Sequence, residues 1–357
     1  MDADNSVQGA SGVRPTMRHV AERAGVGVGT VSRVVNGAAS VSELMIARVQ
    51  KAIDELGFQR DEIARSLHPG QNSLTIGLLL GDLTNPFYAT LAKGAVEFAK
   101  RAGYAVVVSM ADEDPALERR AVDELLGRRV AGLIIVPDRG DHSFLDHANR
   151  FAHVPIVFVD RPARGARADV VLFDNEEGGR MATGQLIAHG HRRIATLIAP
   201  SHYTTGRRLR GYRKALREAG IAVDERLVVT LREGSVQAAE AATRELMALA
   251  DQPTAIFSTT SFLTEGIMRA FRPRRLGVAL VGFDDFRFAD MLPTPITVIA
   301  SDVEELGRQA MRRLLARING DASPLKRLVL PVTLIARGSG EIPIAALPAR
   351  HTGSAVG

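Results

Sequence analysis

Apolar residues repeat with the period of an α-helix near the start of the chain. One face of a first predicted helix consists of four apolar residues: Met17, Val20, Ala21 and Ala24. Thr16 precedes this helix as a favourable N-cap, and Gly25 stands where the helix must stop and the chain must turn. A second predicted helix has three inward positions: Val31, Val34 and Val35. Two short helices that cross at a tight turn predict a helix-turn-helix.

The outer face of the second helix is more polar than its inner face. Its positions, spaced i, i+3, i+4 and i+7, are Gly29, Ser32, Arg33 and Asn36. A DNA major groove accepts such a helix, and polar groups along it can bond bases and phosphates. A third helix, which Ser42 can cap and Gly57 ends, has an apolar stripe: Met45, Val49, Ile53 and Leu56. Three helices that share one core predict a small all-α head.

Two other interpretations of this region stay open on the spacing alone. Pairs of Ala- and Val-rich helices also occur in proteins that do not bind DNA. The run from Gly25 to Thr30 resembles a phosphate-binding glycine loop, but such a loop needs a preceding strand. The preceding segment has a helical period, and a third helix follows, so the pattern favours the helix-turn-helix.

From Leu74 onward, short β-branched runs alternate with amphipathic helical patterns. The predicted strands are Thr75–Leu80, Ala105–Ser109, Gly132–Val136, Ile156–Val159, Ile194–Ile198, Ala255–Phe257 and Ala279–Val281. The predicted helices are Tyr88–Ala102, Ala116–Arg128, Glu177–His189, Arg210–Ala219, Val236–Leu249, Leu263–Phe271 and Glu304–Asn319. Strands separated by helices predict parallel sheets covered on both faces. Over roughly 260 residues, this pattern suggests an α/β core of two doubly wound lobes.

Residues just past the predicted strands are candidates for ligand binding, because open α/β sheets bind ligands beyond the carboxyl ends of their strands. The residues at these places are Phe87, Tyr88, Asp112, Asp138, Asp160, Arg161, Thr260, Ser261 and Asp284. Aromatic rings with carboxylates and guanidinium groups suit a polyhydroxylated or heterocyclic small molecule. The alternative is that loop ends are polar in any case.

Composition and motifs narrow the class of protein. The 357 residues carry a formal net charge of +5 and no cysteine, which excludes disulfides and is typical of a reducing cytoplasm. No apolar run approaches the length of a membrane span. The sequence lacks G-x-S-x-G, H-E-x-x-H and P-loop motifs, so we expect no enzyme and predict no cofactor or metal. His189 and His191 end a helical pattern and are interpreted as helix-terminal residues, and Arg139-Gly140-Asp141 as a loop tripeptide.

The motifs TMRHVAERAGVGVGTVSRVVN, VSELMIARVQKAIDELGF, IARSL and IGLLLGDLTNPFYATLAKG together resemble the LacI/GalR (lactose-repressor) family, and the similarity runs from about Thr16 to about Gly340. The resemblance implies a core like type I periplasmic binding proteins and a homodimer on a pseudo-palindromic DNA operator. It also implies a small-molecule effector, of the sugar or sugar-derivative class, between the lobes.

The candidate DNA contacts combine residue chemistry with this resemblance. Base contacts are expected from Val28, Gly29 and Arg33, with Arg33 as a bidentate donor to guanine and Val28 against a thymine methyl. Phosphate contacts are expected from Thr16, Thr30, Ser32, Asn36 and Ser42. Gly27 and Gly29 replace side chains that the family usually has, and each glycine inside a helix costs about 1 kcal/mol.

Residues Gln59–Leu67 can form two helical turns that Pro69 and Gly70 break. So short a helix is barely stable alone, which makes it a candidate order–disorder switch, with an ordinary linker as the alternative. In the family this segment is a hinge helix that enters the minor groove. Ala64 and Leu67 match the hinge positions, with Leu67 as the wedge between base steps. Arg60-Asp61 replace the usual Pro-Asn.

The resemblance also assigns effector-binding residues. Asp160, Arg161, Arg208 and Asp284 match positions that hold effector in sugar- and purine-binding relatives, and Phe87 and Tyr88 match an aromatic corner. Thr260 and Ser261 replace the usual Asn-Asp, and a bulky aromatic is missing near Val236. A plain hexose is therefore not assumed, and Arg161, Arg207 and Arg208 leave a sugar acid or phosphate open.

These expectations combine into a domain organisation and a function. We expect an N-terminal tail (1–15), a helix-turn-helix domain (16–58), a hinge and linker (59–73), an effector-binding and dimerisation core (74–340) and a C-terminal tail (341–357). Lobe 1 would comprise about 74–172 and 302–328, and lobe 2 about 173–301 and 329–340. The expected function is that of a cytoplasmic transcriptional repressor. The alternative is a small-molecule binding protein or α/β enzyme that does not act on DNA.

Overall fold

The computed structural model describes residues 15–35, 41–58, 73–112, 114–145, 154–199, 203–272 and 276–344. The chain forms two units, Met1–Asn72 and Ser73–Gly357. Three residues with a predicted role in DNA binding lie outside the described residues: Asn36, Ala64 and Leu67.

The first unit is a three-helix head, as predicted. Its described residues form α1 (Met17–Ala24), α2 (Val28–Val35) and α3 (Glu43–Leu56). Their shared core is Val20, Ala21, Ala24, Val31, Val49 and Ala52. Thr16 caps α1, and its hydroxyl accepts a hydrogen bond from the backbone of His19. Ser42 occupies the N-cap position of α3, but its side chain makes no capping hydrogen bond.

The turn between α1 and α2 requires glycine. Gly25 has a φ of +64°, and a Cβ there would lie 2.9 Å from Nη2 of Arg48. That nitrogen donates a hydrogen bond of 2.7 Å to the carbonyl of Ala24. The turn is therefore set by a left-handed residue and held by a cation from α3.

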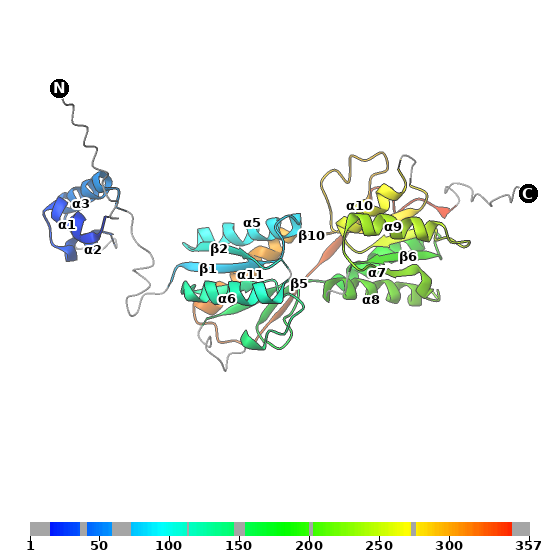
Figure 1. Cartoon of the computed structure of the whole chain (residues 1–357), viewed down its shortest axis with the longest axis horizontal. Coiled ribbons are helices and arrows are strands. Elements are labelled where there is room, and N and C mark those ends of the chain that lie inside the picture. Colours follow the sequence, from blue (N-terminus) through cyan, green and yellow to red (C-terminus); the bar gives the residue numbers. More distant parts are fainter. Residues whose placement is uncertain are drawn as a thin grey trace, which may run out of the picture. The chain divides into compact units, whose positions relative to one another are not determined.

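The second unit contains two six-stranded sheets, here named lobe 1 and lobe 2 (Figure 1). Lobe 1 contains β1 (Thr75–Leu80), β2 (Ala105–Met110), β3 (Gly132–Ile135), β4 (Ile156–Val159), β5 (Asp169–Phe173) and β11 (Arg327–Leu330). Lobe 2 contains β6 (Ile194–Ile198), β7 (Val228–Thr230), β8 (Ala255–Ser258), β9 (Ala279–Phe283), β10 (Thr297–Ser301) and β12 (Val332–Ile335).

The two sheets have the same strand order: β11-β5-β4-β3-β1-β2 in lobe 1 and β12-β10-β9-β8-β6-β7 in lobe 2. All neighbouring strands in lobe 1 are parallel. In lobe 2, β12 alone pairs antiparallel, with β10. The prediction of two doubly wound parallel-sheet lobes is confirmed.

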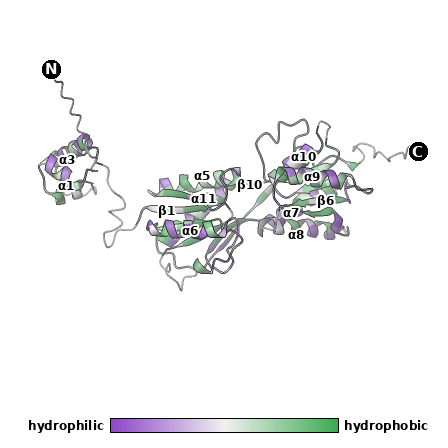
Figure 2. Ribbon diagram, viewed as in Figure 1, coloured by the Kyte–Doolittle hydropathy of each residue, from purple (hydrophilic) through white to green (hydrophobic). Residues whose placement is uncertain are grey.

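Helices cover both faces of each sheet. In lobe 1, α5 (Pro86–Arg101) and α11 (Val303–Ile318) pack on the face of β1 that carries Ile76, Leu78 and Leu80, and α6 (Pro115–Gly127) packs on the face that carries Leu79. In lobe 2 one face carries α7 (Asn175–Ala188) and α8 (Tyr203–Glu218), and the other carries α9 (Val236–Met247) and α10 (Ser261–Ala270). Figure 2 shows hydrophobic residues concentrated in the strands, whereas the helices carry both hydrophobic and hydrophilic residues. This is the pattern of strands buried on both faces.

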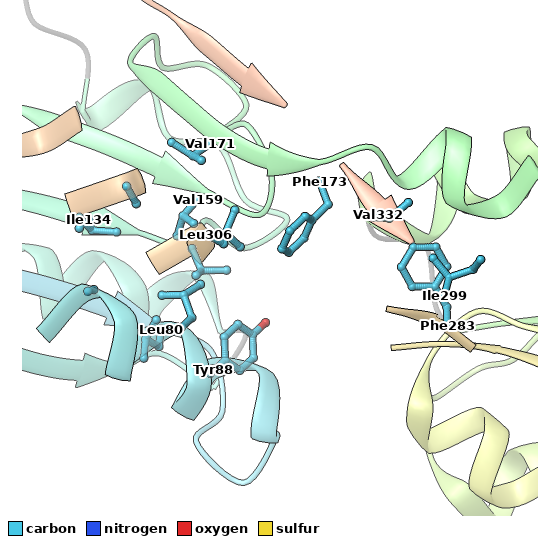
Figure 3. Packing of buried hydrophobic residues seen from close by; sticks show 14 of the residues in the cluster. Leu80, Tyr88, Ile134, Val159, Val171, Phe173, Phe283, Ile299, Leu306 and Val332 are labelled. Carbon is cyan, nitrogen blue, oxygen red and sulfur yellow. The ribbon is translucent and has the colours of Figure 1, made fainter. Parts of the chain in front are cut away.

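The lobes share one hydrophobic core. Their chain passes from one lobe to the other after β5, after β10 and between β11 and β12. Figure 3 shows Phe173 and Val332, from two of these crossings, between the lobe 1 residues around Leu80 and the lobe 2 residues Phe283 and Ile299. The cluster therefore continues through the segments that join the sheets.

Five strands were not predicted: β5, β7, β10, β11 and β12. The sequence prediction depended on alternation of strand and helix. Strands β5, β10 and β12 follow another strand or a loop without an intervening α-helix, and β7 is only three residues long. Helix α8 begins at Tyr203, earlier than the predicted Arg210. The prediction began too late because the first two turns of this helix are mostly polar and give no apolar periodicity.

Close helix crossings position the side chains described below. A Cβ on Gly211 of α8 would lie 2.0 Å from the carbonyl oxygen of Glu176, and one on Gly179 of α7 would lie 2.1 Å from that of Arg208. In lobe 1, Gly94 of α5 and Gly307 of α11 meet backbone atoms in the same way, at 2.0 and 2.1 Å. Backbones this close leave no room for any side chain. No described helix combines the length and hydrophobicity that crossing a membrane requires.

Candidate functional site

A cleft of about 1000 Å³ lies in the second unit, with walls from both lobes. All eight residues predicted to bind an effector line it: Phe87, Tyr88, Asp160, Arg161, Arg208, Thr260, Ser261 and Asp284. Asp112, a further strand-end residue, lines it too. Side chains separated by almost two hundred residues in the sequence are thus brought around one space.

Two aspartates occupy equivalent places in the two lobes. Asp160 follows β4 and Asp284 follows β9, and each has a φ of 70°. The backbone N–H of Asp160 donates to Val171 (2.8 Å), and that of Asp284 donates to Ile299 (2.9 Å). Aspartate tolerates the left-handed conformation better than most residues, and such backbone positions concentrate at functional sites.

Arg161 anchors the lobe 1 wall of the cleft. Its Nε donates to the carbonyl of Pro137 (2.5 Å) and its Nη2 to the hydroxyl of Tyr88 (3.3 Å). Its Nη1 lies 3.8 Å from a carboxylate oxygen of Asp160. The side chain is buried. The guanidinium group is thus engaged by groups of the protein itself.

Arg208 of α8 plays the corresponding part in lobe 2. Its Nε donates to Asn175 (2.8 Å), and its Nη1 donates to the carbonyl of Thr259 (2.6 Å). Both of its terminal nitrogens bond the carboxylate of Asp284, at 3.2 and 3.4 Å. The guanidinium carbon lies 3.5 Å from the ring centroid of Phe283. A bidentate pair stacked on a ring fixes the orientation of Asp284.

Aromatic residues line both sides of the cleft. Phe87 and Tyr88 of α5 form an edge-to-face pair with centroids 5.3 Å apart. Phe262 and Phe286 line the cleft from lobe 2 and were not predicted. Phe262 directly follows the predicted segment Thr260-Ser261, so extending that segment by one residue would have found it; Phe286 lies two residues beyond the predicted Asp284.

Thr260 and Ser261 mark the start of α10 at the cleft. Thr260 is the N-cap of this helix, and its hydroxyl accepts a bond of 3.4 Å from the N–H of Leu263. Ser261 is the first helical residue. The cleft therefore meets a helix N-terminus, where hydroxyl groups and free N–H groups favour oxygen-rich ligands.

Two expectations about the cleft need correction, one for a strand-end residue and one for a helix residue. Asp138 does not line the cleft; its side chain is buried with Glu118 and His142, and the neighbouring Arg139 lines the cleft instead. Arg207, considered as a third cation for an anionic ligand, is absent from the cleft and forms an ion pair of 3.4 Å with Glu176. Both cases show that two residues adjacent in sequence can point into different surroundings.

The described part of the chain contains one group of three close side chains able to ligate a metal: Glu118, Asp138 and His142. This group includes neither of the two histidines that the sequence pattern placed at a helix end, His189 and His191. His189 caps the C-terminus of α7 and lies 2.9 Å from the carbonyl of Gln185. His191 is buried between Thr254 and the carbonyl of Ile342, and burial lowers its pKa.

In the head, the residues expected to read bases are exposed. Val28 has 47% of its surface exposed, and Gly29 and Arg33 are also exposed on α2. Arg33 Nε donates back to the carbonyl of Gly29 (3.3 Å). A Cβ at Gly27 or Gly29 would meet nothing within 4 Å, so packing within the head does not require glycine there. Gly27, expected inside the helix, instead precedes it, and its carbonyl accepts hydrogen bonds from Thr30 and Val31.

The four predicted phosphate contacts that lie among the described residues are spread over the three helices of the head. Thr16 precedes α1, Thr30 and Ser32 lie on α2, and Ser42 precedes α3. Thr16 and Ser42 are exposed, and Thr30 and Ser32 are half-buried. N-terminal ends of helices present N–H groups that bind phosphate oxygens.

A three-helix head with an exposed second helix, followed by a two-lobed core around a polar and aromatic cleft, defines a ligand-responsive regulator. Residues 16–61 match the family described as bacterial regulatory proteins, lacI family. Residues 73–338 match the periplasmic binding proteins and sugar binding domain of the LacI family. The chain belongs to the LacI family, and it is a DNA-binding transcriptional regulator.

Relatives cover the chain almost end to end. The ribose operon repressor of Escherichia coli is 33% identical over 91% of this chain and 99% of its own length. The regulator CelR of Thermobifida fusca is 36% identical over 92% of this chain and 98% of its own. Among solved structures, a Lac repressor dimer bound to operator and the anti-inducer ONPF is similar with a TM-score of 0.79, at 30% identity over 92% of this chain and 99% of that one. A CelR–cellobiose complex is similar with a TM-score of 0.67, at 33% identity over 91% and 100%.

Proposed function

We propose that this chain is a homodimeric repressor whose affinity for a pseudo-palindromic operator is controlled by a neutral sugar or sugar derivative bound in the cleft. The observation that carries the proposal is the pair of aspartates, Asp160 and Asp284, which face one cleft from equivalent places in the two lobes. Carboxylates accept hydrogen bonds from sugar hydroxyls, and aromatic rings pack on the apolar faces of sugar rings. We propose no enzymatic activity.

The balance of charge in the cleft favours a neutral ligand over a sugar acid or phosphate. Five aspartates line it: Asp82, Asp112, Asp160, Asp284 and Asp285. Four arginines line it: Arg139, Arg161, Arg208 and Arg287. Two of these arginines already donate to carbonyl, hydroxyl or carboxylate groups of the protein. An anionic ligand would therefore compete with existing acceptors and meet an excess of carboxylates.

Control of DNA binding follows from which lobe arrangement the ligand prefers. A ligand that contacts both lobes binds one relative arrangement more tightly, and it shifts the population toward that arrangement. We propose that this shift favours or melts the hinge segment that contains Ala64 and Leu67, with Leu67 as the minor-groove wedge. Two heads of a dimer would then gain or lose their joint hold on two half-sites.

For the head, we propose that Arg33 donates to guanine and that Val28 contacts a thymine methyl, with Gly29 close to the base edges. Thr16, Thr30, Ser32, Asn36 and Ser42 would contact phosphates. The exposed Val28, Gly29 and Arg33 on one short helix support this assignment. The open space around Gly29 would let DNA approach the backbone.

The DNA part is tested by fluorescence-anisotropy titration of operator fragments selected from the source genome. Replacement Arg33→Ala should lower operator affinity by about 1–3 kcal/mol and relax one base position. Lys51→Ala, which also removes an exposed cation from the head, should change affinity little. No preference for selected over scrambled duplex at raised salt would support the alternative of a binding protein or enzyme, since non-specific attraction fades with salt.

The effector part is tested by thermal shift of the full chain with pentoses, hexoses, disaccharides, sugar acids and nucleobases. A neutral sugar should raise the midpoint of thermal unfolding in proportion to the logarithm of the sugar concentration, because it binds the folded state. The same sugar should change operator affinity in the anisotropy titration. Stabilisation by sugar acids alone would contradict the charge argument, and stabilisation by none would point to a protein effector.

A further inference from the structure

Lobe 1 contains a buried polar cluster outside the cleft lining. Glu118 lies on α6, and Asp138 and His142 lie on the loop after β3. Their side chains are 2%, 4% and 2% exposed. Nε2 of His142 lies 2.6 Å from Oε1 of Glu118 and 3.9 Å from Oδ1 of Asp138. Three ionisable groups are thus removed from water in one place, which is costly unless their charges are balanced.

Backbone groups hold each member of the cluster by one atom. The N–H of Asp138 donates to Oε2 of Glu118 (2.8 Å), and the N–H of Gly140 donates to Oδ1 of Asp138 (2.5 Å). Nδ1 of His142 lies 3.0 Å from the carbonyl of Gly140. Because a carbonyl only accepts, Nδ1 carries the hydrogen of the neutral ring. The lone pair of Nε2 then faces a carboxylate oxygen, and two acceptors 2.6 Å apart need a proton or a cation between them.

The other carboxylate supplies an independent observation. Oδ2 of Asp138 is buried and accepts no hydrogen bond from any residue that the structure describes. A proton on His142 would satisfy Glu118 but would leave this oxygen without a partner. It would also leave the cluster one negative charge in excess. The nearby cation that acts on Asp138, Arg161, is shared with Asp160 at 3.8 Å. One divalent cation would neutralise both carboxylates beside a neutral imidazole.

We propose that Glu118, Asp138 and His142 bind one divalent transition-metal ion, with Zn²⁺ as the preferred probe. One imidazole nitrogen and two carboxylates are a common donor set for such ions. The Gly140 carbonyl on Nδ1 is the outer partner that orients a metal-binding histidine. Ligand atoms around tetrahedral zinc lie about 3.3 Å apart. Small rotations of the Glu118 and Asp138 side chains would reach that spacing from 2.6 and 3.9 Å.

The ion would fix a segment that belongs to the cleft wall. Pro137 and Arg139 flank Asp138; Pro137 accepts the hydrogen bond from Arg161, and Arg139 lines the cleft. A bound metal would therefore hold two contributions to effector binding in place without touching the effector. Metal affinity itself requires neither DNA nor sugar.

The test is metal binding by the full chain, with any purification tag removed. Chelator-treated protein is dialysed against micromolar Zn²⁺, Mn²⁺ or Mg²⁺, and bound metal is counted by plasma mass spectrometry. We expect one Zn²⁺ per chain, weaker Mg²⁺, and at least a tenfold loss of Zn²⁺ affinity in Glu118→Gln and Asp138→Asn. His189→Gln, which removes a histidine outside the cluster, should bind as the native chain does. Cobalt spectra would report nitrogen and oxygen ligation directly.

A second measurement needs no variant. The midpoint of thermal unfolding of the native chain should be higher with Zn²⁺ than with chelator. Less than one-tenth of an ion per chain, or equal Zn²⁺ affinity in the native chain and a folded Asp138→Asn, would overturn the proposal. If the native chain binds Zn²⁺ but shows neither operator preference nor sugar binding, the proposed function is overturned and the metal-site proposal stands.

Discussion

Lobe 1 and lobe 2 share one strand order but balance their buried charges differently. At the end of β9, Asp284 is paired with Arg208, which α8 brings in from another part of the same lobe. At the equivalent end of β4, Asp160 lies 3.8 Å from the next residue in the chain, Arg161. Lobe 1 also buries Glu118, Asp138 and His142, and it holds Asp169 with two arginines of α11. A common backbone therefore fixes where polar groups stand, and local sequence decides how each is neutralised.

The pairing in lobe 2 gives the largest expected effect. Arg208→Met should destabilise the core by about 3 kcal/mol, because Asp284, Asn175 and the Thr259 carbonyl lose a buried donor. Chemical unfolding in guanidinium chloride measures the change. Arg207→Met, which removes a half-buried ion pair with Glu176 one residue away, should change stability by less than about 1 kcal/mol. Similar losses in both variants would mean that the buried network has no special weight.

The close helix crossings test whether the lobes are equally rigid. Gly211→Ala in lobe 2 and Gly307→Ala in lobe 1 should each cost about 2–3 kcal/mol, because a Cβ would lie within 2.1 Å of a carbonyl oxygen and the helices must move apart. Gly184→Ala, on α7 with open space around it, should be neutral or stabilising. A much smaller cost in one lobe would identify that helix pair as the more adaptable.

The two left-handed aspartates can be compared through ligand affinity. Asp160→Asn and Asp284→Asn preserve the backbone preference but remove the charge. Each should weaken binding of the sugar found by thermal shift by about 10- to 100-fold, since a hydrogen bond to a charged group contributes about 1.5–3 kcal/mol. Isothermal titration calorimetry measures this, with the exposed Asp123→Asn as control. An unchanged affinity in either variant would remove that lobe from the proposed contacts.

The smallest effect is expected from pH. Burial raises the pKa of Asp169, but hydrogen bonds from Arg317, the N–H of Lys326 and Arg313 outweigh burial, so the pKa is lowered. A lowered folded-state pKa adds stability at neutral pH that is lost as pH falls below the usual aspartate range. The equivalent first residue of β10, Thr297, carries no charge. The free energies of unfolding of the native chain and of Asp169→Asn, measured between pH 7 and pH 3, should approach each other as the pH falls. A difference between them that does not change with pH would contradict this linkage.

Much of the fold was predictable because hydrophobic runs such as Thr75–Leu80 leave few alternatives to a buried strand. Strands without a helix before them, such as β5 and β10, escaped the prediction because alternation was the signal. The strand-end rule brought Asp160 and Asp284 to one cleft. It failed for Asp138, whose direction depends on partners 20 residues earlier, at Glu118, and four residues later, at His142. Tertiary pairings of this kind have no periodicity that a sequence could reveal.

The crossing between β11 and β12 has a consequence for synthesis of the protein. These consecutive strands complete the outer edges of two different sheets, β11 beside β5 and β12 beside β10. A nascent chain cut short near residue 326 would leave both sheets one strand short, and bare strand edges recruit other chains. Premature stop codons late in the gene should therefore yield insoluble protein and no truncated repressor with partial activity.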